Sequence, residues 1–198
     1  MLRVLSIDIG TVNYTCCAVN FSESDDLKAK CSHVLLGGRR YASVELIDIF
    51  NVNIGAHVKG LNALDVLISA WDELALFQAW KPDVVLIEQQ FKKAVVNYSL
   101  SITTYTLAKR SFPWCSVRFV RPLSKFAGYK RFFPVLGESY PLGTYKQRKT
   151  AAILLSTTVL QEFFGIASLA DYWRSEGFDT KATKLDDCAD AFLQIFCV

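Results

Sequence analysis

The sequence has no apolar run long enough to cross a membrane. Hydrophobic side chains make up 52% of its 198 residues, yet none of the apolar stretches reaches the ~18 residues that a spanning helix requires. The most apolar segments, Ala63–Trp80 and Ala151–Phe164, carry polar residues at helical spacing. Arg3 and Asp8 lie too close together for a signal peptide. We therefore expect a soluble cytoplasmic protein with no membrane partner.

Cysteine and histidine motifs that bind zinc are also missing. The six cysteines form no C-x-x-C pair, and only His33 and His57 could join them as ligands. This spacing does not predict a zinc site. Buried free thiols are the expected state of the cysteines.

Acidic residues are nearly absent from one long window. Arg118–Lys149 holds eight basic residues and the single acid Glu138, a net charge of +7. Because the whole chain carries only +3, the remainder is at −4. This asymmetry indicates a polyanionic partner.

Hydrophobic periodicity predicts an α/β chain. The expected strands are Arg3–Ile9, Thr15–Phe21, Val44–Ile54, Val84–Glu88 and Val117–Val120. The expected helices are Leu61–Trp80, Ala94–Lys109, Tyr145–Phe164 and Asp186–Phe196. No clear period appears over Arg121–Thr144. We expect one domain, residues 1–198, with a mixed five-stranded sheet flanked by helices.

Two predicted strands carry a carboxylate at or near their ends: Asp8 lies near the end of the first, and Glu88 ends the apolar run "DVVLIE". Burying an unpaired carboxylate is costly, so a positive partner is expected. Asp187 and Asp190 are three residues apart, which on a helix places both on one face. Each acid alone is also explained as a turn former, an exposed strand end or an acid that complements a helix dipole. Together they favour one shared site.

Converging carboxylates predict a divalent metal site, because cations between them relieve their repulsion. Mg²⁺ prefers hard oxygen ligands in near-octahedral geometry. Two such ions roughly 3.5–4 Å apart can activate a water and stabilise the leaving oxygen of a phosphodiester. We therefore expect Asp8, Glu88, Asp187 and Asp190 to hold two Mg²⁺ ions, for which Mn²⁺ can substitute.

Four motifs occur in order along the chain. They are "SIDIG" at Ser6–Gly10, "PDVVLIEQQ" at Pro82–Gln90, the basic "YKQRK" at Tyr145–Lys149 and "KLDDCADAF" at Lys184–Phe192. This set resembles the RuvC-like Holliday junction resolvases of the RNase H-like superfamily, and most closely the poxvirus-type resolvases. The segments Ser22–Gly60 and Pro122–Thr144 are longer than the family pattern, which bears on the virus group and on the junction contacts.

The resemblance implies an RNase H-like fold, a homodimer, Mg²⁺ dependence and symmetric nicking of four-way DNA junctions that leaves 5′-phosphate and 3′-hydroxyl ends. It also implies a role in processing viral DNA concatemers in the host cytoplasm. Asp8, Glu88, Asp187 and Asp190 match the metal-binding acids of the family. Lys149 matches a functional lysine that follows an arginine, which makes these five the candidate catalytic residues.

The basic window is the predicted DNA-binding surface. The bases expected to contact the backbone are Arg121, Lys125, Lys130, Arg131, Lys146 and Arg148. Aromatic residues interleave with them, and these either stack at an open junction or close a small core beneath the loop: Phe119, Phe126, Tyr129, Phe132, Phe133, Tyr140 and Tyr145. Phosphate contacts carry no sequence information, so we expect structure-selective binding that weakens steeply with salt.

Three other readings remain. Another RNase H-like nuclease, such as an RNase H or an exonuclease, would use the same acids. A non-catalytic DNA-binding relative would not need all four. "DIGTVN" at Asp8–Asn13 also resembles the first phosphate loop of actin-like ATPases and sugar kinases. The sequence contains only ten glycines and lacks the second glycine-rich loop of those enzymes.

Overall fold

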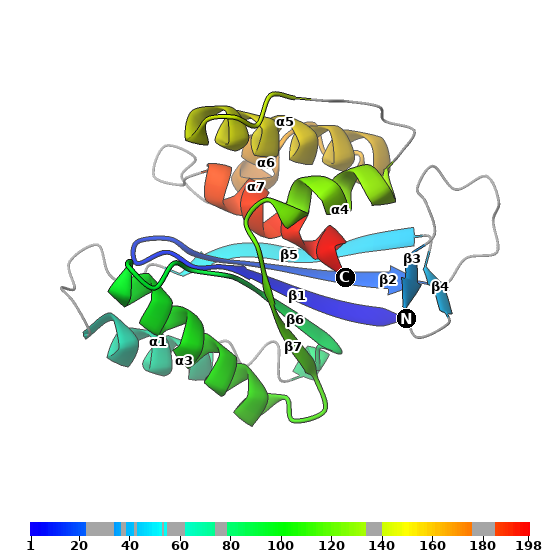
Figure 1. Cartoon of the computed structure of the whole chain (residues 1–198). Coiled ribbons are helices and arrows are strands. Elements are labelled where there is room, and N and C mark those ends of the chain that lie inside the picture. The colour runs from blue at the N-terminus through cyan, green and yellow to red at the C-terminus, as the bar shows by residue number, and fades with distance from the viewer. Residues whose placement is uncertain are drawn as a thin grey trace.

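The computed structural model describes residues 1–22, 34–36, 39–41, 43–52, 54, 62–73, 79–133, 140–175 and 185–198. At its centre is a five-stranded sheet of order β5-β2-β1-β6-β7 (Figure 1). Its strands are β1 (Leu2–Asp8), β2 (Tyr14–Ser22), β5 (Ser43–Val52), β6 (Val84–Glu88) and β7 (Ser116–Val120). Neighbours β1, β2 and β5 pair antiparallel, whereas β6 and β7 continue the sheet parallel to β1. The predicted mixed five-stranded sheet is confirmed.

Helices cover both faces of the sheet (Figure 1). One face carries α1 (Asn62–Glu73) and α3 (Val95–Ser111). The other face carries α4 (Ser124–Phe132), α5 (Tyr145–Phe164), α6 (Leu169–Ser175) and α7 (Leu185–Gln194), which is followed by the 3₁₀ turn η2 (Ile195–Cys197). A separate two-stranded pair joins β3 (Val34–Leu36) to β4 (Arg39–Tyr41).

Alternation along β1 divides the core into two layers. Leu5 and Ile7 pack with α1 and α3, whereas Val4 packs with α4, α5 and α7. Because successive strand residues point to opposite faces, Ser6 and Asp8 lie on the Val4 side. The carboxylate of Asp8 is therefore directed at the face that α7 covers.

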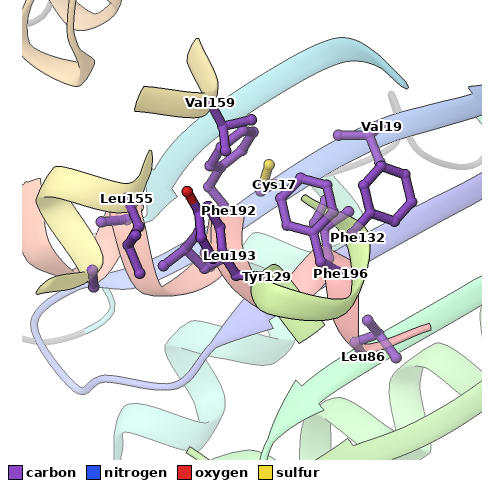
Figure 2. Packing of buried hydrophobic residues seen from close by; sticks show 14 of the residues in the cluster. Cys17, Val19, Leu86, Tyr129, Phe132, Leu155, Val159, Phe192, Leu193 and Phe196 are labelled. Atoms are coloured by element: carbon purple, nitrogen blue, oxygen red, sulfur yellow. The ribbon is translucent and has the colours of Figure 1, made fainter. Parts of the chain in front are cut away.

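Aromatic rings fasten α4 and the C-terminal helix to this face. Figure 2 shows Phe192 and Phe196 among Phe132, Tyr129 and Cys17. The Phe192 and Phe196 rings lie 5.6 Å apart and perpendicular, an edge-to-face contact that adds to the gain from burial. This packing holds α7 against β1 and β2.

The structure adds elements that the sequence did not predict. Helix α4 lies within the region in which no period was evident, and α6 and the β3–β4 pair were not expected. The helix expected over Leu61–Trp80 is described as α1 and a short piece at residues 79–80, with 61 and 74–78 outside the described residues. The last predicted helix ends at Gln194 and continues as the 3₁₀ turn.

Within the described part of the chain, none of the helices is long and apolar enough to cross a bilayer. The cysteines in that part, Cys16, Cys17, Cys115, Cys188 and Cys197, are free thiols, as expected.

Candidate active site

The two strand acids meet at one edge of the sheet. β1 and β6 are neighbouring parallel strands in which Ile7 pairs with Ile87, so Asp8 and Glu88 come next on each and share a face. Burial raises the pKa of Asp8 well above its usual range, and the nearby carboxyl groups of Glu88 and Asp190 raise it further. The carboxyl ends of parallel strands are the usual position of ligand sites in α/β folds.

Helix α7 brings Asp187 and Asp190 to the same edge of the sheet. In Figure 1 the start of α7 lies above the end of β1. Asn13 follows the turn from β1, and its amide Nδ2 donates to Asp187 Oδ2 at 3.1 Å. That turn needs Gly10, because a Cβ there would lie 2.5 Å from the Asn13 carbonyl oxygen. The four predicted acids are thus brought together from segments far apart in the sequence.

Two lysines lie among the carboxylates. Lys125 Nζ, on α4, is 2.7 Å from Asp190 Oδ1 and 3.6 Å from Glu88 Oε1. Lys149 Nζ, on α5, is 2.9 Å from Asp187 Oδ1, 2.9 Å from Asp190 Oδ2 and 3.2 Å from an oxygen of Asp186. These ion pairs join α4, α5, α7 and β6 around one cluster.

Burial and charge oppose each other at both lysines. Burial alone would lower the pKa of Lys149, but the charges of Asp190 and Asp187 outweigh it and raise that pKa above its usual range. Burial likewise disfavours the charged form of Lys125, and Asp190 and Glu88 raise its pKa overall. Both ammonium groups therefore stay protonated at neutral pH.

The cluster still carries more negative than positive charge. Among the described residues, two lysines form the ion pairs of this cluster, against the five acids Asp8, Glu88, Asp186, Asp187 and Asp190. Within the described residues, no group of three or more His, Cys, Asp or Glu side chains is arranged to hold a metal ion, and ammonium groups lie between the acids instead.

The donor chemistry nevertheless suits a hard divalent cation, because each acid offers carboxylate oxygens. A second observation agrees. Thr15 Oγ1 is buried without a hydrogen-bond partner on the residue that pairs with Asp8, and it shares the face of that acid. Asp8, Glu88, Asp187 and Asp190 are the residues that would hold the ion.

Most of the predicted DNA-contacting bases lie at the surface. Arg121, Lys130, Arg131 and Lys146 are exposed. Arg131 also donates to the carbonyl oxygens of Phe196 and Val198, so it fastens the end of the chain to α4. Arg148 is half-buried and donates to the carbonyl oxygen of Leu142.

Lys125 differs from the expectation for a backbone-contacting base. It is only 5% exposed, and its ammonium group faces Glu88 and Asp190 rather than solvent. The sequence did not predict that Lys125 contacts these acids, because a buried lysine and a surface lysine cannot be distinguished within a basic segment. Gln90, which donates to Glu88 Oε2 at 2.8 Å, and Asn13 were also missed.

The aromatic residues of the basic window divide into two groups. Phe126, Tyr129, Phe132 and Phe133 are buried in the core, the alternative that made them part of a closed cluster. Tyr140 is partly buried and packs against that cluster. Phe119 and Tyr145 are exposed, and the Tyr145 ring centroid lies 5.6 Å from Lys149 Nζ.

Phe91 is a prominent exposed aromatic side chain that lies outside the basic window. Phe91, three residues after Glu88, is 75% exposed and is followed by the exposed bases Lys92 and Lys93. An exposed ring beside bases and next to an acidic cluster is a ready stacking surface for a nucleic acid base. The signal was present in "IEQQFKK", in which a phenylalanine and two lysines directly follow the polar end of a strand.

The sheet order and the helices on its two faces define an RNase H-like fold, with the acidic cluster at the carboxyl ends of β1 and β6. Comparison with solved structures agrees. The chain is similar to RuvC of Thermus thermophilus, with a TM-score of 0.57 and 12% identity over 99% of this chain and 92% of that one.

It is also similar to fowlpox virus resolvase, solved with its substrate Holliday junction DNA, with a TM-score of 0.54 and 19% identity over 96% of this chain and 92% of that one. The yeast mitochondrial Holliday junction resolvase Ydc2 matches with a TM-score of 0.56 and 17% identity over 99% of this chain and 78% of that one. No protein-family model and no curated protein sequence matches the chain. The fold predicted from the resemblance is therefore confirmed by structure alone.

Proposed function

We propose that this protein is a divalent-metal-dependent endonuclease that resolves four-way DNA junctions. The observation that carries the proposal is the convergence of Asp8, Glu88, Asp187 and Asp190 at one sheet edge, in a chain that shares the fold of RuvC and the fowlpox virus resolvase. Exposed bases and the exposed rings of Phe91 and Tyr145 near this edge support a DNA substrate.

The four carboxylates would hold Mg²⁺, two ions per site, with Mn²⁺ as a substitute. Bound there, divalent ions supply an activated water and charge stabilisation for the leaving oxygen of the phosphodiester. Cleavage of this kind leaves 5′-phosphate and 3′-hydroxyl ends.

The residues of this chain position the acids and the phosphate. Asn13 orients the Asp187 carboxylate by its hydrogen bond, and Lys125 holds Glu88 and Asp190 in place. Lys149, the least buried of the two lysines, neutralises charge on the scissile phosphate from the α5 side. Exposed Arg121, Lys130 and Lys146 contact the backbone without reading sequence.

We also propose a homodimeric state and a cellular role for this protein. A four-way junction has two scissile strands, so a two-fold homodimer would present one site to each. Two alternative interfaces are proposed, one formed by α1 and the other by α3. The corresponding role is processing of viral DNA concatemers in the host cytoplasm, which microscopy of the tagged protein in cells would test.

The deciding experiment is cleavage of a synthetic four-way junction by the purified protein with Mg²⁺ or Mn²⁺. We expect paired symmetric nicks. Asp187→Asn should reduce the cleavage rate about 100-fold, because it removes one of the carboxylates that would hold the metal, while junction binding is retained because the exposed bases are unchanged. The exposed α5 acid Glu162, changed to Gln, is the matched control and should cut normally.

Absence of cleavage with both metals would refute the nuclease assignment. Cleavage of linear duplex or RNA–DNA hybrid in preference to the junction would instead favour another RNase H-like nuclease. An Asp187→Asn protein that does not fold would show that this carboxylate is structural.

A further inference from the structure

Gln194 is a buried polar residue whose amide bonds to the backbone of two strands. It lies on α7 one turn beyond Asp190, and only 2% of it is exposed. Its amide Nε2 donates to two backbone carbonyl oxygens, that of Ile7 at 3.3 Å and that of Leu86 at 3.1 Å. Ile7 directly precedes Asp8, and Leu86 is two residues before Glu88. One side chain thus connects the helix that carries two of the acids to both strands that carry the others.

The surroundings of Gln194 do not require an amide for stability. Its neighbours Leu193 and Ile195 are fully buried apolar side chains. The two acceptor carbonyls belong to interior strands, β1 between β2 and β6 and β6 between β1 and β7, so the sheet already supplies them with partners. A carbonyl oxygen has two lone pairs, so it can accept from its partner in the sheet and from the Gln194 amide at the same time. An apolar side chain of similar length in place of Gln194 would therefore leave each carbonyl with its partner in the sheet.

The Gln194 amide adds a directional constraint on the position of α7. Apolar burial is non-directional, so rings such as Phe192 and Phe196 hold α7 against the sheet without fixing its position along the strands. Hydrogen bonds constrain distance and angle. A donor shared between two adjacent strands therefore constrains α7 in both directions in the plane of the sheet.

We propose that Gln194 is a positioning residue, which sets the registry of α7 over β1 and β6 and thereby the spacing of Asp187 and Asp190 from Asp8 and Glu88. The inference rests on the proposed function, because that spacing matters where the four acids hold a divalent ion. Mg²⁺ demands near-ideal octahedral geometry, whereas Ca²⁺ accepts six to eight oxygens in flexible arrangements. Loss of registry should therefore affect Mg²⁺ more than Ca²⁺.

The test is Gln194→Met, a change that keeps the length and removes the donor. Isothermal titration of the DNA-free protein should show Mg²⁺ affinity reduced about tenfold, the low end for loss of a group that orients metal ligands. Ca²⁺ affinity should change less than about twofold, as its flexible coordination allows. The urea midpoint without metal should stay close to that of the unchanged protein. On junction DNA, kcat should fall while KM stays constant.

Gln161→Met is the matched control. Gln161 also donates through Nε2 to a backbone carbonyl oxygen, that of Ala167 at 2.6 Å, but it is exposed near the end of α5. It loses the same kind of bond away from the acids and should bind both ions normally.

Unchanged Mg²⁺ affinity in Gln194→Met would overturn the inference. Equal losses of Mg²⁺ and Ca²⁺ affinity together with a lowered urea midpoint would also overturn it, because they would indicate a purely structural role. If that variant does not fold, Gln194→Leu takes its place, and failure of both to fold would also overturn the inference. If the unchanged protein binds Mg²⁺ and cuts junctions while Gln194→Met matches it, only this inference fails. If the unchanged protein binds no divalent ion, the proposed function fails with it.

Discussion

Lys149 contacts three carboxylates at once, one more than Lys125, the other lysine of the site. Its Nζ lies within 3.2 Å of oxygens from Asp186, Asp187 and Asp190. An ammonium group in this position occupies space between ligands that a divalent ion would share. The Tyr145 ring, whose centroid lies 5.6 Å from Lys149 Nζ, offers a cation–π contact to the same ammonium group.

We predict that Lys149→Met binds Mg²⁺ about tenfold more tightly than the unchanged protein, because a competing cation is removed from between the acids. Cleavage of the junction should nevertheless fall, since the charge that faces the phosphate is lost. Titration of metal-free protein by calorimetry measures the first effect. Lys146→Met, an exposed base on the same helix, is the control, and weaker Mg²⁺ binding by Lys149→Met would contradict the prediction.

Phe91 is the second residue with a specific expected effect. Base stacking on an aromatic side chain contributes about 1–3 kcal/mol, so Phe91→Ala should weaken junction binding about tenfold without loss of stability. Fluorescence anisotropy of a labelled junction measures the affinity. Trp114→Ala removes an exposed ring that precedes the start of β7, at the other end of the sheet from Glu88. An equal loss of affinity in both variants would argue against a specific role for Phe91.

Part of the site was predictable at this scale. Asp8 and Glu88 stand at the ends of apolar strands, and Asp187 and Asp190 have helical spacing, so local patterns mark all four. Lys125 and Asn13 carry no such mark. Their roles depend on contacts across 65 and 174 residues, to Asp190 and Asp187, and local sequence patterns do not encode such contacts.

At the scale of elements, α4 shows why a helix can escape periodicity analysis. Its buried residues have helical spacing, but they include Lys125 and Gly128 beside Phe126, Tyr129 and Phe132. A lysine and a glycine on the buried face dilute the apolar stripe on which recognition depends. The five strands of the main sheet and α5 were predictable because their apolar residues recur at the spacing of a strand or a helix. Helix α6, seven residues long, is too short to establish a period.

The glycine of α4 allows the close approach of this helix to the 3₁₀ turn. A Cβ at Gly128 would lie 2.4 Å from the carbonyl oxygen and 2.8 Å from the carbonyl carbon of Phe196, both of them backbone atoms. We predict that Gly128→Ala lowers the free energy of unfolding by about 1–3 kcal/mol, the usual cost of overpacking a core. It should also slow cleavage, because Lys125 lies on the preceding turn of α4.

Urea unfolding measures this loss, and Gly143→Ala provides the comparison. A Cβ at Gly143 would meet only a side-chain oxygen of Gln147 at 3.4 Å, an ordinary contact. Equal stability of the two variants would show that α4 and the turn can separate without cost.

At the scale of the whole molecule, the buried thiols predict a pH dependence of stability. Burial raises the pKa of Cys16 and Cys17, and raises that of Cys115 and Cys197 from 9.0 to about 11. Above pH 9 the unfolded chain loses thiol protons that the folded chain keeps. By linkage, the free energy of unfolding should therefore fall as pH rises from about 9 toward 11.

Urea unfolding at a series of pH values tests this expectation. Cys197→Ala should reduce the slope, since one of the contributing thiols is removed. Stability that is constant or rising across this range would contradict the prediction.

The acids of the cluster come from opposite ends of the chain, with Asp8 on the first strand and Asp187 and Asp190 on the last α-helix. During synthesis on the ribosome, Asp8 is made 179 residues before Asp187, and Glu88 is made 99 residues before it. A polypeptide that ends before Asp187 therefore carries at most two of the four carboxylates. In the proposed nuclease, such an incomplete polypeptide would be unable to cut nucleic acids, because the site is complete only after α7 has been synthesised.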